Sequence, residues 1–511
     1  MKHIFFIGFL FVGLLSFAQL ADPVSGVEYN TTRKENFSGF IGENTTSLFS
    51  MDYLYLSRKK QELNVRKFHK SSLELVESRN LFMEPEGDFY SEPKEAYFYN
   101  DKIYLFTTLF GEKGNPNLLE LKVFNSAFEK ISQGIVDTLD LDEEIFIQDS
   151  KEGDQFVIGR YNKYSKLTEQ RINLTLIDKA GIVVWRESIK SPMALQNLTI
   201  EEIRFSNTSP IYVLCNYAFE LRNRNAVSDQ DMLNNKYAVW AYDRDKHFLK
   251  EFELRIKGKW INGIRLGIND RDQLLVSGFM NESKNYSING VFSLLVNQRL
   301  DVVNSTFQKF DDDTRKKFIE EKDLNKKKEL EDYVLNDMVI MEDDSYFLLG
   351  ECFYKYVERN YDPRTNITST TEHYNYNSII VSYFDKDGNL QWTERVPKFQ
   401  NSTNDYGYFA SYSTMNVDTG VYVFFNDTDK NNEVGIGDYF GYKGLYNNRR
   451  AQITTVGISK DGIVERRPLI ESSNPFILRA KQCRQISSRT MYLMGETGRE
   501  SRIFSVSLAS N

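Results

Sequence analysis

A hairpin pattern recurs along the whole chain, and it constrains the fold more than any other feature of the sequence. The stretch "VSYFDKDGNLQW", residues 381–392, reads as an alternating apolar strand, a tight turn and a second strand. Similar stretches are "LTLIDKAGIVVW" at 174–185 and "TTVGISKDGIVERR" at 454–467. Turn residues between alternating runs indicate β-hairpins. In the first stretch Gly388 tolerates a positive φ, and Asp385 can bond its own backbone.

A second class of hairpin alternates with the first. Its clearest example is "MVIMEDDSYFLLGE", residues 338–351, and similar hairpins occur at 96–110, 146–161, 202–217, 263–280, 415–425 and 483–498. The two classes together form a unit that recurs about seven times, at intervals of roughly 50–75 residues. Repeated four-stranded antiparallel sheets bury their faces by packing in a ring. We therefore predict an all-β fold, a β-propeller with seven blades, or alternatively eight, and four antiparallel strands per blade.

The two ends of the chain are less regular than the rest. The stretch "MDYLYLSRKKQELNVRKF", residues 51–68, looks like a third-and-fourth-strand hairpin without its partner. After the last hairpin, near Met494, the chain has only "RIFSVSL" to add. We therefore expect N-terminal strands to complete the final blade and close the ring. In this interpretation residues 19–46 are an N-terminal segment, and 47–511 form a single propeller.

The first residues have the pattern of a secretory signal peptide. Lys2 precedes an apolar stretch from Ile4 to Leu15, and Ser16 and Ala18 have the spacing of a cleavage site. Because the apolar run is short for a bilayer, a membrane anchor is the weaker alternative. We predict that residues 1–18 are removed after Ala18, and that the mature protein is soluble and carries no lipid-anchor cysteine.

The long insertions all belong to one kind of connection. In a propeller blade, the loop between the second and third strands and the link to the next blade lie on one face. Long loops in compact domains are commonly functional. The face that carries them is therefore the candidate binding surface. The insertions are Glu220–Tyr237, Gln308–Tyr333, Tyr354–Asn377 and Thr428–Arg450.

Two of these insertions have a distinctive composition. Residues 307–333 are rich in Asp, Glu and Lys, with opposite charges four residues apart, which predicts a charged helical insertion near 308–335. Such a helix is either a solvated surface helix or a partner-docking helix. The stretch "NNEVGIGDYFGYKGLYNNRRAQ", residues 431–452, is rich in Gly, Tyr and Arg. It is either an interface, since Tyr and Arg are enriched at interface hot spots, or a loop of self-packed aromatics. The interface candidates are Tyr439, Phe440, Tyr442, Tyr446, Arg449 and Arg450.

No residue pattern supports catalysis or a cofactor. The formal net charge is -8 with acids and bases mixed, whereas a nucleic-acid partner requires a basic stripe. His69, His247 and His373 are scattered over different repeats. Residues 427–438 place oxygen ligands at alternate positions, as in a calcium loop, but Asn432 stands where that loop needs Gly. We therefore expect no catalytic residue, no metal site, no cofactor and no nucleic-acid partner.

The signal ending "SFAQ", the Asn-, Lys- and Tyr-rich composition and the "FDKDGNLQW" blades together resemble exported β-propeller proteins of Bacteroidota-type bacteria. The resemblance covers most of the mature chain. It implies a periplasmic location. It also implies one specific role, an accessory propeller of the type 9 secretion translocon, such as the plug that closes the periplasmic end of its outer-membrane barrel.

The functional prediction is a non-catalytic propeller that docks on an envelope protein through its long-loop face. It has no membrane span of its own. One alternative is a glycan-active propeller enzyme, a lyase or hydrolase, which needs acids or His clustered in the central funnel. Another is a lectin-like glycan binder, which needs exposed aromatic platforms repeated from blade to blade.

Overall fold

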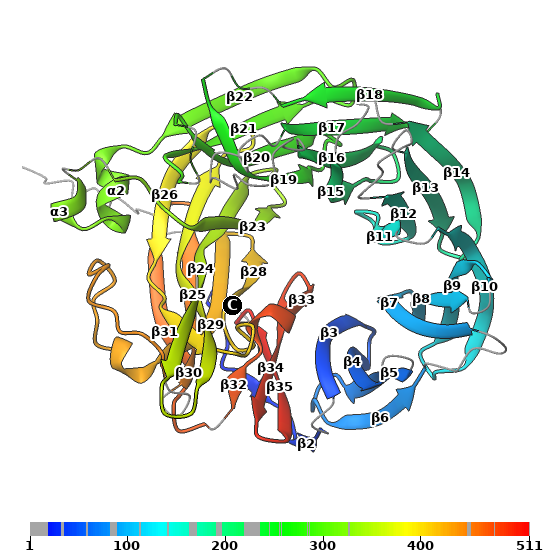
Figure 1. The fold of residues 1–511 in the computed structure, drawn as a ribbon, viewed down its shortest axis with the longest axis horizontal. Coiled ribbons are helices and arrows are strands. Elements are labelled where there is room, and N and C mark those ends of the chain that lie inside the picture. The colour runs from blue at the N-terminus through cyan, green and yellow to red at the C-terminus, as the bar shows by residue number, and fades with distance from the viewer. Residues whose placement is uncertain are drawn as a thin grey trace, which may run out of the picture.

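The protein is an all-β propeller of eight antiparallel sheets arranged in a ring, six with four strands, one with five and one with six (Figure 1). The computed structural model describes residues 19–509 except 32–34, 58–59, 82–88, 112–113, 141–142, 163–170, 191–196, 219–235, 245, 255, 257, 284, 286, 325, 327, 447–450 and 475. The predicted signal peptide, residues 1–18, lies outside the described residues. Within them, no helix is long and apolar enough to cross a membrane.

Seven blades are built from consecutive strands. Blade 1 contains β3 (Glu35–Glu43), β4 (Ser47–Ser57), β5 (Lys60–His69) and β6 (Leu75–Asn80), and blade 2 contains β7 (Phe89–Tyr99), β8 (Lys102–Gly111), β9 (Asn117–Asn125) and β10 (Lys130–Leu139). Blade 3 contains β11 (Glu143–Asp149), β12 (Gln155–Asn162), β13 (Arg171–Asp178) and β14 (Val183–Lys190), and blade 4 contains β15 (Asn197–Arg204), β16 (Ile211–Ala218), β17 (Lys236–Asp243) and β18 (Phe248–Glu253). Blades 5 to 7 contain β19 (Trp260–Ile268), β20 (Leu274–Asn281), β21 (Gly290–Val296) and β22 (Val302–Lys309); β23 (Tyr333–Ile340), β24 (Tyr346–Asp362), β25 (Ile367–Phe384) and β26 (Leu390–Val396), with β27 (Gln400–Thr403) on β25; and β28 (Ser413–Val417), β29 (Gly420–Thr428), β30 (Ala451–Ser459) and β31 (Val464–Ile470). Helices α2 (Asp312–Phe318) and α3 (Glu321–Leu324) link blades 5 and 6.

Blade 8 joins the two ends of the chain. Its C-terminal strands are β32 (Ile477–Leu478), β33 (Arg484–Ser487), β34 (Thr490–Thr497) and β35 (Glu500–Ser507). Its outer edge is formed by β1 (Val24–Ser25) and β2 (Tyr29–Asn30), which pair antiparallel with β35. Leu20 adds a bridge to Leu508. N-terminal strands close the ring, as predicted, but they lie at residues 24–30, within the segment 19–46 that we set apart from the propeller, and not at 51–68.

The propeller has eight blades, which was the alternative prediction, and the favoured prediction of seven blades is wrong. The difference is blade 1, whose first strand, β3, begins inside the segment that we set apart as 19–46. Its sequence, "ENFSGFIGE", has register shifts at Gly39 and Gly42, so its alternation is broken. Residues 51–68 accordingly contribute the second and third strands of that blade rather than the third and fourth.

Apolar seams between neighbouring blades hold the ring together. Eight clusters of buried residues in the described part of the chain coincide with the eight seams. In the seam that closes the ring, Tyr492 and Ile503 of blade 8 pack with Phe40 and Leu48 of blade 1. Because each blade buries both of its faces in this way, no separate central core is needed.

The recurring turn of the sequence is one structural device used in several blades. In blade 6, Asp385 Oδ1 accepts hydrogen bonds from the backbone N–H of Asp387 (3.0 Å) and Asn389 (2.9 Å). Gly388, with φ of 81°, completes the turn. Asn125, Asp178 and Asn297 make the same pair of bonds in blades 2, 3 and 5. These short turns lie on one side of the ring, which we call the short-turn face.

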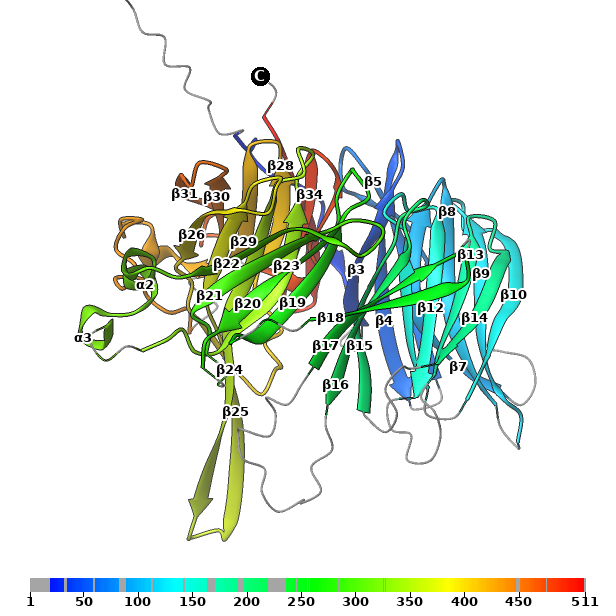
Figure 2. The ribbon, with the colours of Figure 1, turned by 90° about the horizontal axis from the view of Figure 1, so that it is seen from above.

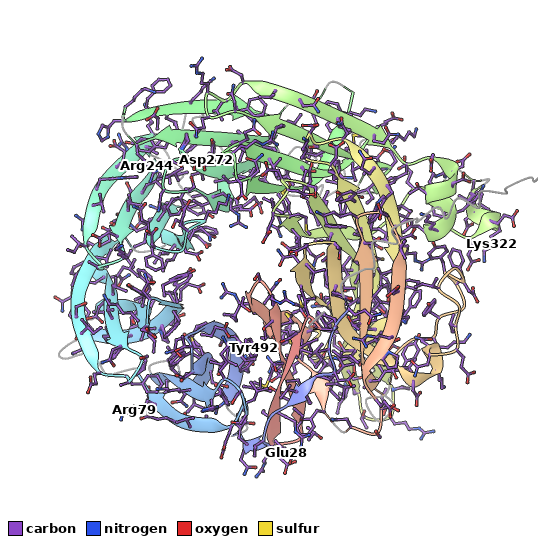
Figure 3. All side chains as sticks on the ribbon, turned by 180° about the vertical axis from the view of Figure 1, so that it is seen from behind. Glu28, Arg79, Arg244, Asp272, Lys322 and Tyr492 are labelled. Carbon is purple, nitrogen blue, oxygen red and sulfur yellow. The ribbon has the colours of Figure 1, made fainter. Side chains whose placement is uncertain are left out.

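The short turns are also bonded to one another. Arg244 donates to the backbone oxygens of Ser206 (3.0 Å) and Ser209 (2.8 Å). Ser206 Oγ in turn donates to Asp272 of blade 5 at 2.8 Å. Figure 3 shows Arg244 and Asp272 close to each other in the ring. Blades 4 and 5 are therefore cross-linked at this face, which is built for rigidity.

Gly388→Ala should lower the free energy of unfolding by about 1–3 kcal/mol, because a Cβ is strained at positive φ. A Cβ there would also lie 2.8 Å from Ser293 Oγ of the neighbouring blade. Urea unfolding of the mature chain measures the change. Gly498→Ala is the control, since Gly498 also has positive φ (63°) but no atom within 4 Å of the added Cβ. An equal loss in both variants would contradict the role of the Ser293 contact.

Candidate functional site

The described long connections emerge on the face opposite the short turns, which we call the long-loop face. They are the β24–β25 hairpin beyond Cys352, the α2–α3 insertion and the loop 429–446. Figure 2 shows the hairpin projecting far from the ring, on the side away from the C terminus. Most of the predicted insertion Glu220–Tyr237 lies outside the described residues.

The projecting hairpin is a continuation of two blade strands. β24 and β25 stay paired from Phe353–Tyr376 out to Asp362–Ile367. Residues 354–362 are exposed on both faces of the ribbon. Large apolar side chains are nevertheless present on it, with exposed fractions of 49% for Tyr356, 60% for Tyr361 and 61% for Ile367. Exposed aromatics on a rigid projection are typical of a protein-binding surface.

Side-chain pairs across the two strands hold the hairpin together. The rings of Tyr356 and His373 stack with centroids 4.4 Å apart and an interplanar angle of 7°. His373 Nε2 lies 3.2 Å from Glu358 Oε2. On the other face, Lys355 Nζ is 2.6 Å from Glu372. Tyr356 and His373 are directly opposite each other, and the two ion pairs are diagonal; cross-strand contacts of both kinds stabilise a sheet.

The base of the hairpin is fixed by a buried ion pair. Lys398 Nζ and Glu351 Oε1 are 2.5 Å apart, and both side chains are essentially inaccessible. Lys398 also donates to the backbone oxygen of Tyr376 at 2.9 Å, and Ser411 donates to Glu351 at 2.7 Å. Burial lowers the pKa of Lys398, while the Glu351 carboxylate acts in the opposite direction. The network joins β24 and β25 to the segment that leads into blade 7.

The aromatics named from the sequence lie in the loop 429–446, and most pack on the outer strands of blades 6 and 7. Tyr439 donates to Glu394 at 2.7 Å. The guanidinium carbon of Arg395 lies 5.0 Å from the ring centroid of Phe440, and the Phe440 side chain remains 44% exposed. The other named residues are Tyr442, which is buried under Arg466, Tyr446, which is 78% exposed, and Arg449 and Arg450, which lie outside the described residues.

The charged insertion contains two short helices that dock on blade 6. Lys317 of α2 bonds Glu394 at 2.7 Å, and Arg395 donates to the backbone oxygen of Lys317 at 2.8 Å. The ion pairs within α2, Asp312–Arg315 and Asp313–Lys316, are three residues apart rather than four. One face of α2 is therefore occupied by contacts with blade 6 of the same chain. Figure 3 shows Lys322, a residue of α3, at the outer rim of the ring.

The central channel is polar and hollow. Two cavities of about 630 and 610 Å³ share four residues of β23, Asn336, Asp337, Met338 and Ile340, and both are lined by inner strands of the blades. Glu202 is bonded to Arg204 at 2.5 Å and to the backbone N–H of Leu266 at 2.9 Å. Burial raises the pKa of Glu202 and of Glu95. Glu202 therefore has two partners within the chain, the Arg204 guanidinium and the N–H of Leu266.

The residues singled out as a calcium loop are used otherwise. Asp427 is bonded to Arg466 and accepts from Asn431 at 2.7 Å. In the part of the chain that the structure describes, no group of three or more His, Cys, Asp or Glu side chains is placed to hold a metal ion.

The sequence indicated an insertion at Tyr354–Asn377, but none of its residues was among the predicted interface candidates. The missed signal is composition. The β24 stretch "FYKYVERNYD" and the β25 stretch "ITSTTEHYNYN" contain many Tyr, Val and Thr residues, which favour strands. The intervening "PRTN" is a turn sequence. The long-loop face is therefore dominated by a strand pair rather than by an irregular loop.

Comparisons with known proteins return solved structures with low TM-scores and very low sequence identity. No protein-family model and no curated protein matches the chain. Among solved structures, the WD40 domain of SCAP from fission yeast is 8% identical with a TM-score of 0.40, covering 96% of this chain and 98% of that one. Cobalt-substituted apocarotenoid oxygenase from Synechocystis is 8% identical with a TM-score of 0.35, covering 68% of this chain and 69% of that one. Prolyl oligopeptidase B from Galerina marginata is 8% identical with a TM-score of 0.34, covering 84% of this chain and 47% of that one.

Proposed function

We propose that the protein is a non-catalytic docking propeller of the bacterial periplasm, which binds an envelope protein through its long-loop face. The observation that carries the proposal is the β24–β25 hairpin, which projects from the ring with exposed Tyr356, Tyr361 and Ile367. Its buried base holds it in one orientation. A rigid platform with one apolar projection fits protein recognition better than small-molecule chemistry.

The signal-peptide pattern and the resemblance to exported Bacteroidota-type propellers support the location. They also support a narrower form of the proposal, in which the partner is the outer-membrane barrel of a type 9 secretion translocon and this chain is its accessory or plug. In that form the hairpin enters or contacts the periplasmic end of the barrel.

Shortening the hairpin should abolish docking. The variant replaces Glu358–Thr371 by Asn-Gly, which closes a two-residue hairpin turn. It keeps the Lys355–Glu372 ion pair. Tagged wild type is expected to recover a stoichiometric partner from native envelopes, and the shortened variant at most about a tenth as much.

Phe248→Ser is the matched control, because Phe248 is 59% exposed on the short-turn face. It should recover as much partner as wild type. Recovery of wild type alone would overturn the docking proposal and direct attention to glycan screens of the polar channel. Equal recovery by the shortened variant would place docking elsewhere on the ring.

A further inference from the structure

The hairpin has an unpaired edge in addition to its exposed side chains. β24 pairs with β23 only as far as Cys352, while its pairing with β25 continues to Asp362. Among the residues that the structure describes, no strand covers the outer edge of β24 over residues 354–362. Such an edge presents a row of backbone donors and acceptors to a further strand.

Two hydrogen bonds establish which residues face this edge. The N–H of Phe353 donates to Asp332 O at 2.8 Å, so its backbone points away from β25. The C=O of Glu372 accepts a hydrogen bond from Asn404 N at 3.0 Å, so the backbone groups of Glu372 point away from β24. When two residues are directly opposite each other in an antiparallel pair, the backbone N–H and C=O groups of both point toward the partner strand or both point away from it. Val357 is opposite Glu372, so its backbone groups also point away from the partner strand. Both observations place the backbone groups of alternate residues on the open edge, namely Lys355, Val357, Arg359 and Tyr361.

The opposite edge of the hairpin is already largely occupied. β27 pairs with β25 at His373–Tyr376, and Asn404 extends this contact to Glu372. Only Thr368 and Thr370 remain there as outward-facing positions in the described hairpin. The chain thus uses strand addition itself at one edge and leaves the longer edge open. A two-stranded ribbon alone is marginally stable in water, so a third strand would stabilise this one.

We propose that the open edge of β24 binds an extended segment of another protein by adding it as an antiparallel or parallel strand. The inference rests on the proposed docking function and specifies its chemistry. Backbone groups at alternate positions recognise one class of partner, an extended polypeptide, whatever its sequence.

The flanking side chains select among extended segments. Glu358 is paired with His373, and Lys355 with Glu372. Arg359 is exposed and pairs with no carboxylate of the described residues. Val357 and Tyr361 flank it on the same face of the ribbon, 47% and 60% exposed. The complementary strand therefore carries an acidic side chain that faces Arg359, with apolar side chains two residues away on either side.

Val357→Pro tests the edge directly, since it removes an outward N–H without breaking the β24–β25 pairing. The probe is a displayed library of random peptides of about 12 residues, which is long enough for one strand, selected on the full mature chain. Enriched peptides should bind Val357→Pro roughly tenfold or more weakly than wild type. Thr370→Pro is the matched control, because it removes an outward N–H from the opposite edge, and it should bind within about twofold.

Two further readouts separate strand addition from loss of folding. Amide hydrogen exchange should show peptide-induced protection at Lys355, Val357, Arg359 and Tyr361. Arg359→Glu leaves the backbone unchanged, and its enriched peptides should change from acidic to basic at the facing position.

Several outcomes would overturn the inference. They are a selection without binders, undiminished binding to Val357→Pro, or self-association of the chain through this edge, which would assign it to a second copy. None of them bears on partner recovery from envelopes by the full-length and shortened chains, so failure here and failure of the docking function are distinguishable.

Discussion

Arg479→Met should lower the free energy of unfolding by about 3 kcal/mol, because it breaks a buried ion pair that closes the ring. Arg479 is 1% exposed and lies between blade 8, blade 1 and the segment that links blades 6 and 7. It bonds Glu496 at 2.9 Å and Asn36 Oδ1 at 3.0 Å. Its guanidinium also lies 3.5 Å from the ring centroid of Tyr408. Met fills much of the volume but leaves these oxygens without their donor.

Arg479 matters for stability because it bonds residues of both blades at the seam that closes the ring, Glu496 in blade 8 and Asn36 in blade 1. The C-terminal strands of blade 8 have no covalent link to blade 1, so they are held in the ring by non-covalent contacts, which include the apolar seam, the pairing of β35 with β1 and β2, and the bonds of Arg479. Urea unfolding of the mature chain measures the loss. Arg79→Met is the control, since Arg79 pairs with Glu77 on the outer strand β6 and is 54% exposed (Figure 3). It should change stability by less than about 1 kcal/mol. Equal effects in the two variants would show that closure does not depend on Arg479.

The turns and strands that are encoded locally could be predicted from the sequence. "DKDGN" specifies a turn because Asp385 accepts from the backbone N–H groups of Asp387 and Asn389 and Gly388 adopts positive φ, all within five consecutive residues. Seven of the eight blades contain hairpins recognisable in this way. β3 was not recognised, because Gly39 and Gly42 interrupt its alternation and its strand character comes from pairing with β4.

The candidate site depends more on contacts between distant residues, which local patterns do not encode. Tyr439, Phe440 and Tyr442 have the composition of an interface, but their surroundings are decided by Glu394, Arg395 and Arg466 on two outer strands. The length of the β24–β25 hairpin was visible as an insertion. Its open edge was not, because edge exposure depends on where β23 stops and where β27 begins to pair.

Lys398→Met should cost about 3–5 kcal/mol, the largest effect expected of any single substitution considered for this chain. It leaves the Glu351 carboxylate, 1% exposed, buried beside Ser411 without its cation. The bonds that Lys398 donates to Gln400 and to the backbone oxygen of Tyr376 are lost as well. Urea unfolding measures the loss. A change below about 1 kcal/mol would mean that water or a rearrangement replaces the cation.

The double variant Glu351→Leu with Lys398→Met separates the pair from its setting. Well-packed apolar replacements for a buried ion pair are often neutral or stabilising by about 1–4 kcal/mol, so the double variant should recover most of the stability. It should not recover the orientation of the hairpin, because Lys398 is the donor that ties Tyr376 of β25 to Gln400 at the start of β27. Amide exchange at His373–Tyr376 should therefore remain faster than in wild type. If the double variant restored slow exchange as well as stability, the ion pair would be a packing element, and the fixed angle of the hairpin would have to come from β27 alone.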